Sequence, residues 1–220
     1  MKLNILYEDK NLIVCFKPSG VPSQSDKSFD TDMVSAVLLY ERENGVKEPY
    51  CALINRLDKP VMGIVLMAKN KKTAALLSNT DFKKEYLAVV SGCPLQNSGE
   101  YRDFLVKDGR TNTSKVTGKN TPNAKEAVLE YEVLETDDNE RTLVKIRLIT
   151  GRHHQIRVQF AQRGTPLCGD TKYGMEDRKC NGVALCAYRL TFLHPYRHEE
   201  MSFEVKPQGE IFENFKLLSD

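Results

Sequence analysis

An arginine and an aspartate, Arg56 and Asp58, stand two positions apart between two apolar segments. Residues 52–54 precede the pair, and residues 64–68 form a short apolar run of the kind that is typical of a buried strand. Charges at the edge of a buried strand are unfavourable unless they pair with each other or perform chemistry. Two interpretations follow: a structural ion pair that closes a loop, or a carboxylate that acts in catalysis.

Residues 54–69, which read I-N-R-L-D-K-P-V-M-G-I-V-L-M-A-K, resemble the catalytic motif of the RluA-type pseudouridine synthases. Further segments resemble motifs of the same family in the same chain order, and together the matches span residues 5–207. These segments are 5–20, 84–92, 150–159 with 169–174, and 185–195. The resemblance implies an isomerase that converts uridine in RNA to pseudouridine. It also implies that the chain corresponds to the family's catalytic domain, without the S4-type RNA-binding domain that many relatives carry.

The resemblance implies a role for particular side chains. Asp58 corresponds to the family's essential aspartate, Arg157 to the arginine that pairs with it, and Tyr86 to the tyrosine that stacks on the target base. Arg56 corresponds to the arginine that helps to hold or replace the flipped base. Contacts with RNA are implied for three more residues: Arg152, His154 and Gln155. Without the motif, a tyrosine in a strand would indicate core packing.

The isomerisation breaks the bond from ribose C1′ to N1 of the base and remakes it to C5. Asp58 would act as a nucleophile or would take the 2′ proton, and the sequence leaves both routes open. Two other functions compete: an RNA-binding protein that has lost the reaction, and a hydrolase with paired carboxylates. The hydrolase is disfavoured because only Asp58 lies in a catalytic context.

The chain departs from the family pattern at several places. Asn55 stands where histidine is usual, residues 60–63 replace a Thr-Ser-Gly turn, His153 replaces a small residue, and Gln159 replaces a histidine. Asp58, Tyr86 and Arg157 are intact, so the departures bear on the choice of substrate more than on the chemistry.

Composition is that of a globular protein, with 40% hydrophobic and 28% charged residues among 220. We expect one catalytic domain over residues 1–220, a cytoplasmic location, and a monomer that needs no protein partner and does not contact a membrane. No apolar run approaches the roughly 20 residues that span a bilayer. The six cysteines and four histidines do not cluster as metal ligands, and no phosphate-binding loop is present, so neither a metal nor an organic cofactor is expected.

Net charge is only +2, but residues 102–125 carry six basic residues against Asp103 and Asp108. This segment, rich in Thr, Asn and Gly, is predicted to be a basic loop or hairpin. It is either a solvated surface or, in an RNA-modifying enzyme, a contact for phosphates.

Periodicity predicts the elements that position these residues. Strands are expected at 3–7, 12–16, 64–68, 86–90, 127–135, 142–148, 185–192 and 201–205, and helices at 31–44, 71–79 and 155–163. The order favours an α+β fold with a mixed, largely antiparallel sheet and flanking helices. The family resemblance adds a central RNA-binding cleft.

Overall fold

A computed structural model describes residues 1–25, 31–174 and 182–218. The chain divides into two compact units: unit 1 comprises residues 1–82 and 187–205, and unit 2 comprises residues 83–186 and 206–220. The single domain expected over residues 1–220 stays a prediction. Within the described residues, no helix combines the length and the apolar character needed to cross a membrane.

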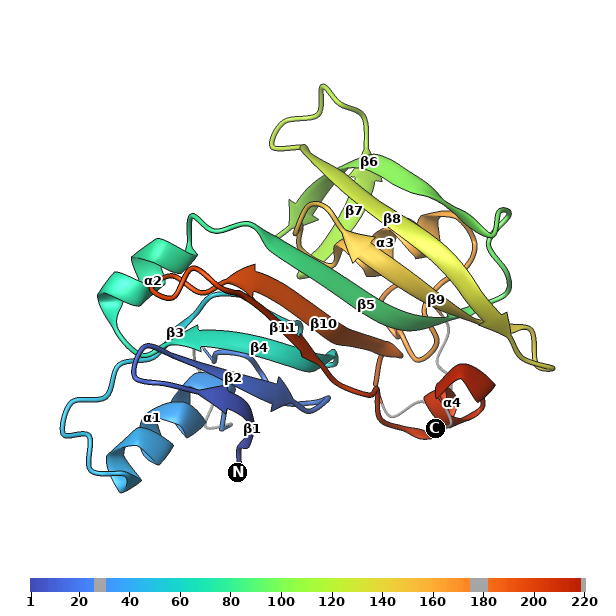
Figure 1. Ribbon diagram of the computed structural model, residues 1–220. Coiled ribbons are helices and arrows are strands. Elements are labelled where there is room, and N and C mark those ends of the chain that lie inside the picture. The colour runs from blue at the N-terminus through green and yellow to red at the C-terminus, as the bar shows by residue number, and fades with distance from the viewer. Residues whose placement is uncertain (26–30, 175–181, 219–220) are drawn as a thin grey trace. The chain divides into compact units, whose positions relative to one another are not determined.

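Unit 1 is built on strands in the order β1-β2-β4-β10, with β3 paired to β4 and β11 paired to β10 (Figure 1). Their bounds are β1 Asn4–Glu8, β2 Leu12–Lys17, β3 Ala52–Leu53, β4 Met62–Ala68, β10 Leu185–Leu193 and β11 Glu200–Glu204. The first two residues of β10 belong to unit 2. Leu12 lies opposite Ala68 and Lys17 opposite Gly63, so the antiparallel β2–β4 ladder fixes which residues leave the sheet together.

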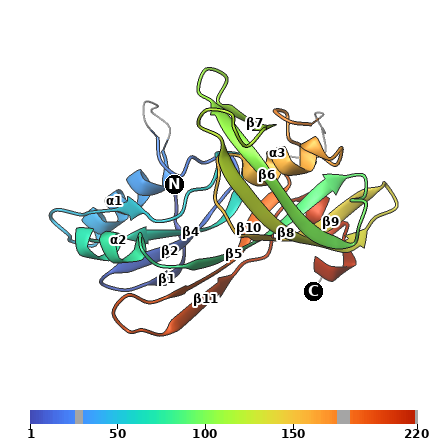
Figure 2. The same ribbon diagram turned by 90° about the horizontal axis from the view of Figure 1, so that it is seen from above.

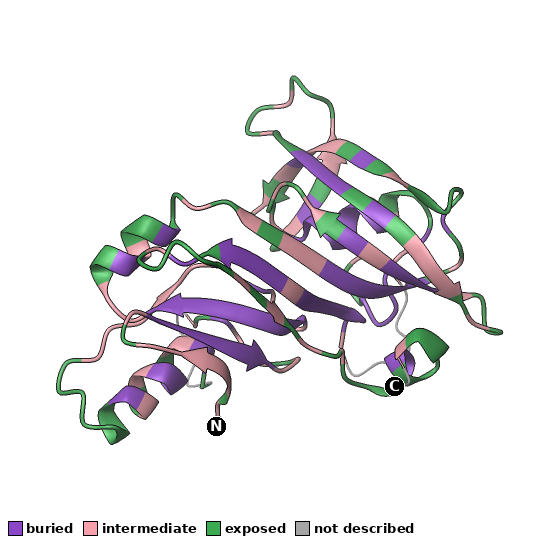
Figure 3. Ribbon diagram, viewed as in Figure 1, coloured by how far each residue is buried: buried purple, intermediate pink, exposed green. Residues whose placement is uncertain are grey.

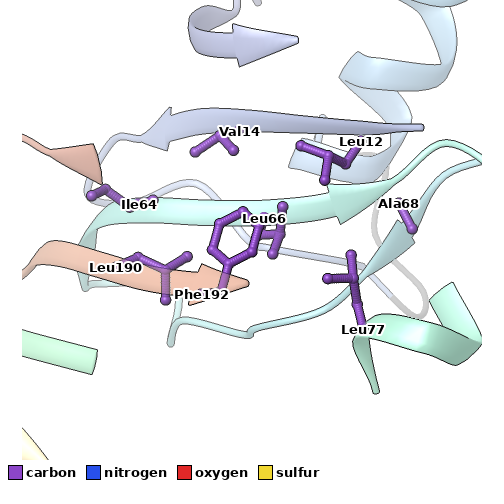
Figure 4. Packing of buried hydrophobic residues seen from close by; sticks show 8 residues of the cluster. All are labelled: Leu12, Val14, Ile64, Leu66, Ala68, Leu77, Leu190 and Phe192. Carbon is purple, nitrogen blue, oxygen red and sulfur yellow. The ribbon is translucent and has the colours of Figure 1, made fainter. Parts of the chain in front are cut away.

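Every residue of β2 and β4 is buried, as the colouring of Figure 3 shows for β4. Both strands are nearly continuous apolar runs, which is the pattern of strands covered on both faces. Side chains of β2, β4, β10 and α2 meet in one cluster that includes Leu66, Leu77 and Phe192 (Figure 4). Full burial of each such side chain contributes about 1.5–3 kcal/mol, so this core holds β4 in place.

The two helices predicted in unit 1 are confirmed as α1 (Met33–Glu43) and α2 (Lys71–Leu77). Each begins where a side chain caps the first turn: Asp32 Oδ1 accepts the Ser35 N–H at 2.8 Å, and Asn70 Oδ1 accepts the Thr73 N–H at 2.9 Å. Such caps typically contribute about 1 kcal/mol.

Unit 2 is built on strands in the order β5-β9-β8-β6-β7. The bounds are β5 Phe82–Ser91, β6 Ser98–Asp108, β7 Thr113–Thr117, β8 Lys125–Thr136 and β9 Arg141–Leu148, with helices α3 Gln155–Gln162 and α4 Glu210–Glu213 and the 3₁₀ turn Lys216–Leu218. The predicted pairing of 127–135 with 142–148 is confirmed as β8 and β9. Of the two alternatives for residues 102–125, the hairpin is confirmed: β6 and β7 pair through the turn between Asp108 and Thr113.

The α+β fold class is confirmed, and every strand pair with a described register is antiparallel. The central RNA-binding cleft stays a prediction.

Candidate active site

Asp58 lies in the loop that leads from β3 into β4, and this loop is attached to the edge of β4. After β3 ends, the Ile54 N–H donates to the carbonyl of Leu66 at 2.9 Å. The Asn55 side chain continues the attachment: its Nδ2 donates to Ile64 O at 2.9 Å, and its Oδ1 accepts the Leu66 N–H at 2.7 Å. The amide of Asn55 therefore takes the place of a strand backbone where the loop departs from the sheet.

Buried residues alternate along the loop with more accessible ones. Leu57 is buried, and Ser23 holds it on both sides: Ser23 Oγ donates to Leu57 O at 2.8 Å and accepts the Leu57 N–H at 3.1 Å. Arg56, between the anchors Asn55 and Leu57, is exposed, and Asp58 is half-buried. The charged pair thus points away from the core while its neighbours hold the backbone.

Lys17 fastens the other side of the Asp58 loop. Its side chain is fully buried, and its Nζ donates to the carbonyls of Pro18, Val21 and Lys59 at 3.0, 2.7 and 3.2 Å. Burial lowers the pKa of Lys17 to about 8, while the negative charge of Asp58 acts in the opposite direction. An ammonium group is therefore close enough to Asp58 to interact with its charge.

The turn after Lys17 adds two more contacts with the same loop. The Gly20 N–H donates to Lys59 O at 2.9 Å, and Ser19 Oγ donates to Pro60 O at 2.8 Å. These bonds give the Lys-Pro-Ser-Gly turn a scaffold role for the loop that carries Asp58. The burial of Lys17 and its bond to Lys59 O in the Asp58 loop were missed, although a lysine that ends an apolar strand is the signal that could have indicated them.

Gly63, where the loop enters β4, has a backbone φ of +127°. A Cβ atom at this position would stand 2.4 Å from Ala187 O of β10. Only glycine allows both this conformation and the close approach of the neighbouring strand. The turn that departs from the family pattern therefore still ends in the residue that the geometry requires.

Arg157 lies in unit 2 on α3, with a side chain only 4% exposed. Its Nε and Nη2 donate to the two carboxylate oxygens of Asp170, both at 2.7 Å. Asp170 is fully buried and also accepts the Lys172 N–H at 3.1 Å. This bidentate geometry fixes the plane of the guanidinium group. Because Arg157 and Asp58 belong to different units, their predicted pairing stays a prediction.

Tyr86, the third predicted catalytic residue, lies on β5 opposite Ile146 of β9 and is 7% exposed. Its proposed stacking on a base is not tested by the fold of unit 2.

The three residues predicted to contact RNA surround the start of α3. Gln155 is buried, and its amide bonds to Thr150 Oγ1, to the backbone N–H of Arg152 and to Val128 O at 2.8, 2.9 and 3.0 Å. His154 is also buried and has a left-handed φ of +54°. The bonds of Gln155 fix the turn that leads into α3. Arg152 is exposed, and its Nε donates to Glu126 O at 2.8 Å. Contact of the three residues with RNA stays a prediction.

Gln159 is buried where the family usually has histidine. Its Nε2 lies near three acceptors, the closest being Asp103 Oδ2 at 2.7 Å. Its Oε1 is buried without a hydrogen-bond partner in the described part of the chain. Gln159 therefore joins α3 to β6 from inside the unit.

Exposed cations mark the hairpin of β6 and β7. Arg102 is engaged with Glu100 at 2.9 Å and Glu126 at 2.8 Å. The remaining basic side chains of the hairpin and of the loop after it are exposed; we call these four the hairpin cations. They are Lys107, Arg110, Lys115 and Lys119.

Among residues 1–25, 31–174 and 182–218, no group of three or more histidine, cysteine or carboxylate side chains could hold a metal ion. Cys15, Cys168 and Cys186 are buried free thiols, Cys51 is partly buried and Cys93 is exposed, while Cys180 lies outside the described residues. Burial raises the pKa of Cys15 to about 12, so this thiol stays protonated at neutral pH. The expectation of a reaction without metal or cofactor stays a prediction.

Comparisons with known proteins bear on this arrangement. A family model described as RNA pseudouridylate synthase matches residues 11–162. The chain is 36% identical over 178 residues to the ribosomal large subunit pseudouridine synthase C of Rickettsia conorii, covering 79% of this chain and 57% of that protein. It is 34% identical over 208 residues to the uncharacterized RNA pseudouridine synthase YjbO of Bacillus subtilis, covering 91% and 71%. The chain thus spans little more than half the length of the first of these relatives.

Among solved structures, the human RNA pseudouridylate synthase domain containing 4 matches with a TM-score of 0.77 and 24% identity, over 96% of this chain and 90% of that one. At this identity the likeness concerns the fold.

Proposed function

The chain belongs to the RNA pseudouridylate synthase family, and from this premise we propose that it isomerises specific uridines in RNA to pseudouridine, with Asp58 as the catalytic carboxylate. One observation carries the proposal: the loop that carries Asp58 has a fixed backbone and leaves the Asp58 side chain partly accessible. Asn55, Ser23 and Lys17 hold the backbone on either side of it, while Asp58 itself is half-buried. A rigid backbone and an accessible carboxylate are what positional catalysis requires.

The reaction breaks the C1′–N1 bond, turns the uracil, forms the C1′–C5 bond, and moves the C5 proton to solvent while N1 gains one. Asp58 would attack C1′ or the base as a nucleophile, or would take the 2′ proton. Lys17, whose own pKa responds to the charge of Asp58, is held beside the same loop by its bond to Lys59 O. No electron or group is gained from outside, so the balance requires no cofactor.

Arg157 would support the charge of Asp58, and Tyr86 would stack on the uracil. The ion pair with Asp170 supports the role of Arg157 because it orients the guanidinium group before substrate arrives.

RNA would be bound by Arg56, Arg152 and the hairpin cations, all of which are exposed. Arg56 would hold or replace the flipped base, because it follows the anchored Asn55 and lies two positions from Asp58. Phosphate contacts by the hairpin cations would supply affinity without reading sequence. His154 and Gln155 would contact the RNA from the turn at the start of α3.

The substrate would be ribosomal or transfer RNA. The name of the Rickettsia relative, a ribosomal large subunit synthase, favours ribosomal RNA. We also propose that the protein acts in the cytoplasm as a monomer, without an obligate protein partner. Mapping pseudouridine in cells with and without the gene would identify the RNA and the position.

The function is tested with Asp58→Asn, which keeps the size of the side chain and removes its charge. Circular dichroism, RNA binding and pseudouridine formation are measured on one preparation. We expect folded protein, RNA affinity within about tenfold of wild type, and no detectable pseudouridine. Asp138→Asn, at an exposed position far along the chain in unit 2, is the matched control and should keep full activity.

Substantial turnover by well-folded Asp58→Asn would refute the assignment of Asp58. Wild-type protein that binds RNA and leaves every uridine unchanged would instead identify a catalytically inactive RNA-binding protein with the same fold.

A further inference from the structure

The turn formed by residues 170–174 is bonded both to Arg157 and to the cationic hairpin. Asp170 at its start holds the guanidinium group of Arg157 through two bonds of 2.7 Å. The turn is closed on itself, because the Gly174 N–H donates to Asp170 O at 2.8 Å and the Lys172 N–H to Asp170 Oδ1 at 3.1 Å. A short closed turn moves as one body, so its remaining side chains keep a fixed relation to Arg157.

Tyr173 extends from this turn to the hairpin. Its ring centre lies 5.3 Å from Arg157 Cζ, and the ring packs against the cluster of Leu105, Ala127 and Val158. Its hydroxyl oxygen accepts the backbone N–H of Ser114 at 2.7 Å. Ser114 lies on β7, the last strand of the sheet of unit 2. An edge strand has backbone groups that no further strand satisfies, and here one of them bonds to the phenol.

The same hydroxyl lies 2.7 Å from His154 Nδ1. His154 is the residue before α3, and its φ of +54° is a conformation that non-glycine residues adopt rarely. One oxygen atom of Tyr173 therefore joins the backbone of the hairpin to the start of the helix that carries Arg157. Both views of the ribbon show β7 beside α3 (Figures 1 and 2), and the two elements are in contact.

Two further bonds support this junction. Ser114 Oγ lies 2.9 Å from His153 Nδ1, and the His153 ring stacks on that of His154 with centres 3.8 Å apart. Lys172 Nζ donates to Asn112 O, in the turn of the hairpin, at 2.9 Å. His153 therefore adds a second tie between the hairpin and α3, beside the one that Tyr173 makes.

Ser114 and Lys115 point in opposite directions, because side chains alternate along a strand. Ser114 is buried against Tyr173, and Lys115 is exposed with the other hairpin cations. We propose that Tyr173 is a positioning residue that keeps the cationic hairpin in register with Arg157, so that a phosphate held by the hairpin is placed for reaction as well as bound. The inference rests on the proposed function and deepens it.

The proposal separates turnover from affinity. A hairpin that only attracts RNA would change the affinity and leave the turnover of bound RNA untouched. A hairpin held in register also aligns the bound RNA, and misalignment of reacting groups by about 1 Å can lower turnover up to a hundredfold. The tie to Arg157 should therefore appear in the rate at saturating RNA.

The test removes one oxygen atom. Tyr173→Phe keeps the ring against Arg157 and the packing, but the Ser114 N–H loses its acceptor. We expect turnover at saturating RNA to fall about fivefold to tenfold, because one or two hydrogen bonds that hold the hairpin are lost. RNA affinity should stay within about twofold, because no phosphate contact is removed. The Ser114 amide should exchange with solvent faster, while those of β8 and β9 keep their rates. The control is Tyr131→Phe, which removes another buried hydroxyl, one that donates to Gln96 O at 3.3 Å. It should change neither the turnover at saturating RNA nor the exchange rate of the Ser114 amide.

A double-mutant cycle distinguishes positioning from a purely structural role. Lys115→Met should lower turnover at saturating RNA at least about threefold in the wild-type background and hardly at all with Tyr173→Phe, because the register is already lost. His153→Ala removes the bond to Ser114 Oγ, should act in the same direction as Tyr173→Phe, and replaces that variant in the cycle if Tyr173→Phe does not fold.

The inference would be overturned if Lys115→Met changed turnover by the same factor in both backgrounds, or changed it in neither. The proposed pseudouridine synthase activity would not be affected by that result. A wild-type protein without pseudouridine formation would overturn the proposed function and, with it, the inference.

Discussion

Lys17→Met should lower the free energy of unfolding, and the difference from the wild type should increase as the pH rises. The variant keeps an unbranched side chain that reaches to Cε, and it removes the amine that donates to the carbonyls of Pro18, Val21 and Lys59. Lys59 O keeps the Gly20 N–H as a donor. Two partly buried carbonyls thus lose their Lys17 donor, at about 1–3 kcal/mol each.

The buried ammonium group offsets part of this loss. The pKa of Lys17 is lowered from 10.5 to about 8, and a difference of roughly 2.5 at about 1.4 kcal/mol per pH unit makes burial of the charge unfavourable by about 3 kcal/mol at neutral pH. The variant does not bury this charge. At pH 7.5 the net loss in the free energy of unfolding should therefore be only about 1 kcal/mol.

The sign of the pH dependence follows from proton binding. Between pH 8 and 10.5 the unfolded chain binds the Lys17 proton and the folded chain does not, so wild-type stability gains a contribution as pH rises. The variant lacks this contribution, and the difference between the two proteins should grow by about 2 kcal/mol from pH 7.5 to 9.5. Buried thiols such as Cys15, with a pKa raised to about 12, lower stability at alkaline pH in both proteins and cancel in the difference.

Urea unfolding followed by circular dichroism at several pH values gives this difference directly. Pseudouridine formation should fall more than RNA affinity, because Lys17 holds the loop that carries Asp58. A difference in stability that stays constant from pH 7.5 to 9.5 would refute the reasoning, since the ammonium would then not be buried as described.

Two further predictions concern other parts of the chain. Neutralising the hairpin cations together should flatten the slope of log affinity against log salt by up to about 3, at roughly 0.7–0.9 for each lost phosphate contact; an unchanged slope would show a solvated surface. The control neutralises four exposed cations elsewhere: Lys2, Arg42, Lys47 and Lys206. Gly63→Ala should lower the free energy of unfolding by more than about 2 kcal/mol, because φ is +127° and Ala187 O would stand 2.4 Å from the new Cβ. Gly151→Ala, with open space around it, should unfold close to the wild-type temperature, and equal melting of the two variants would contradict the geometry.

Local patterns predicted the fold well where one segment decides its own conformation. The apolar run of β4 and the capped starts of α1 and α2 are examples, because burial and a capping side chain act within a few residues. The extent of β6 was missed, since its exposed positions alternate with few large apolar residues. Pairing across the sheet, rather than composition, determines that strand.

The same distinction applies to the candidate site, where the sequence indicated some residues and not the residues that they contact. The motif indicated Asp58 and Arg157, but their neighbours come from distant segments. Ser23 and Leu57 are separated by 34 positions, and Ser114 and Tyr173 by 59. Such pairs form only when the topology brings the segments together, so neither spacing nor composition could indicate them. Tyr173 was visible as part of a motif, and its bond to the hairpin was not.

Because the side chain of Asn55 is an amide, its hydrogen bonds between the Asp58 loop and β4 do not depend on pH in the mildly acidic range. One donor and one acceptor are required at this place, for Ile64 O and the Leu66 N–H. A neutral imidazole would offer the same pair of groups, one donor and one acceptor. Protonation, which free histidine undergoes near pH 6.5, would turn that acceptor into a second donor and oppose it to the Leu66 N–H. Asn55 does not titrate, so in this chain the attachment of the loop to β4 persists when the surroundings become mildly acidic.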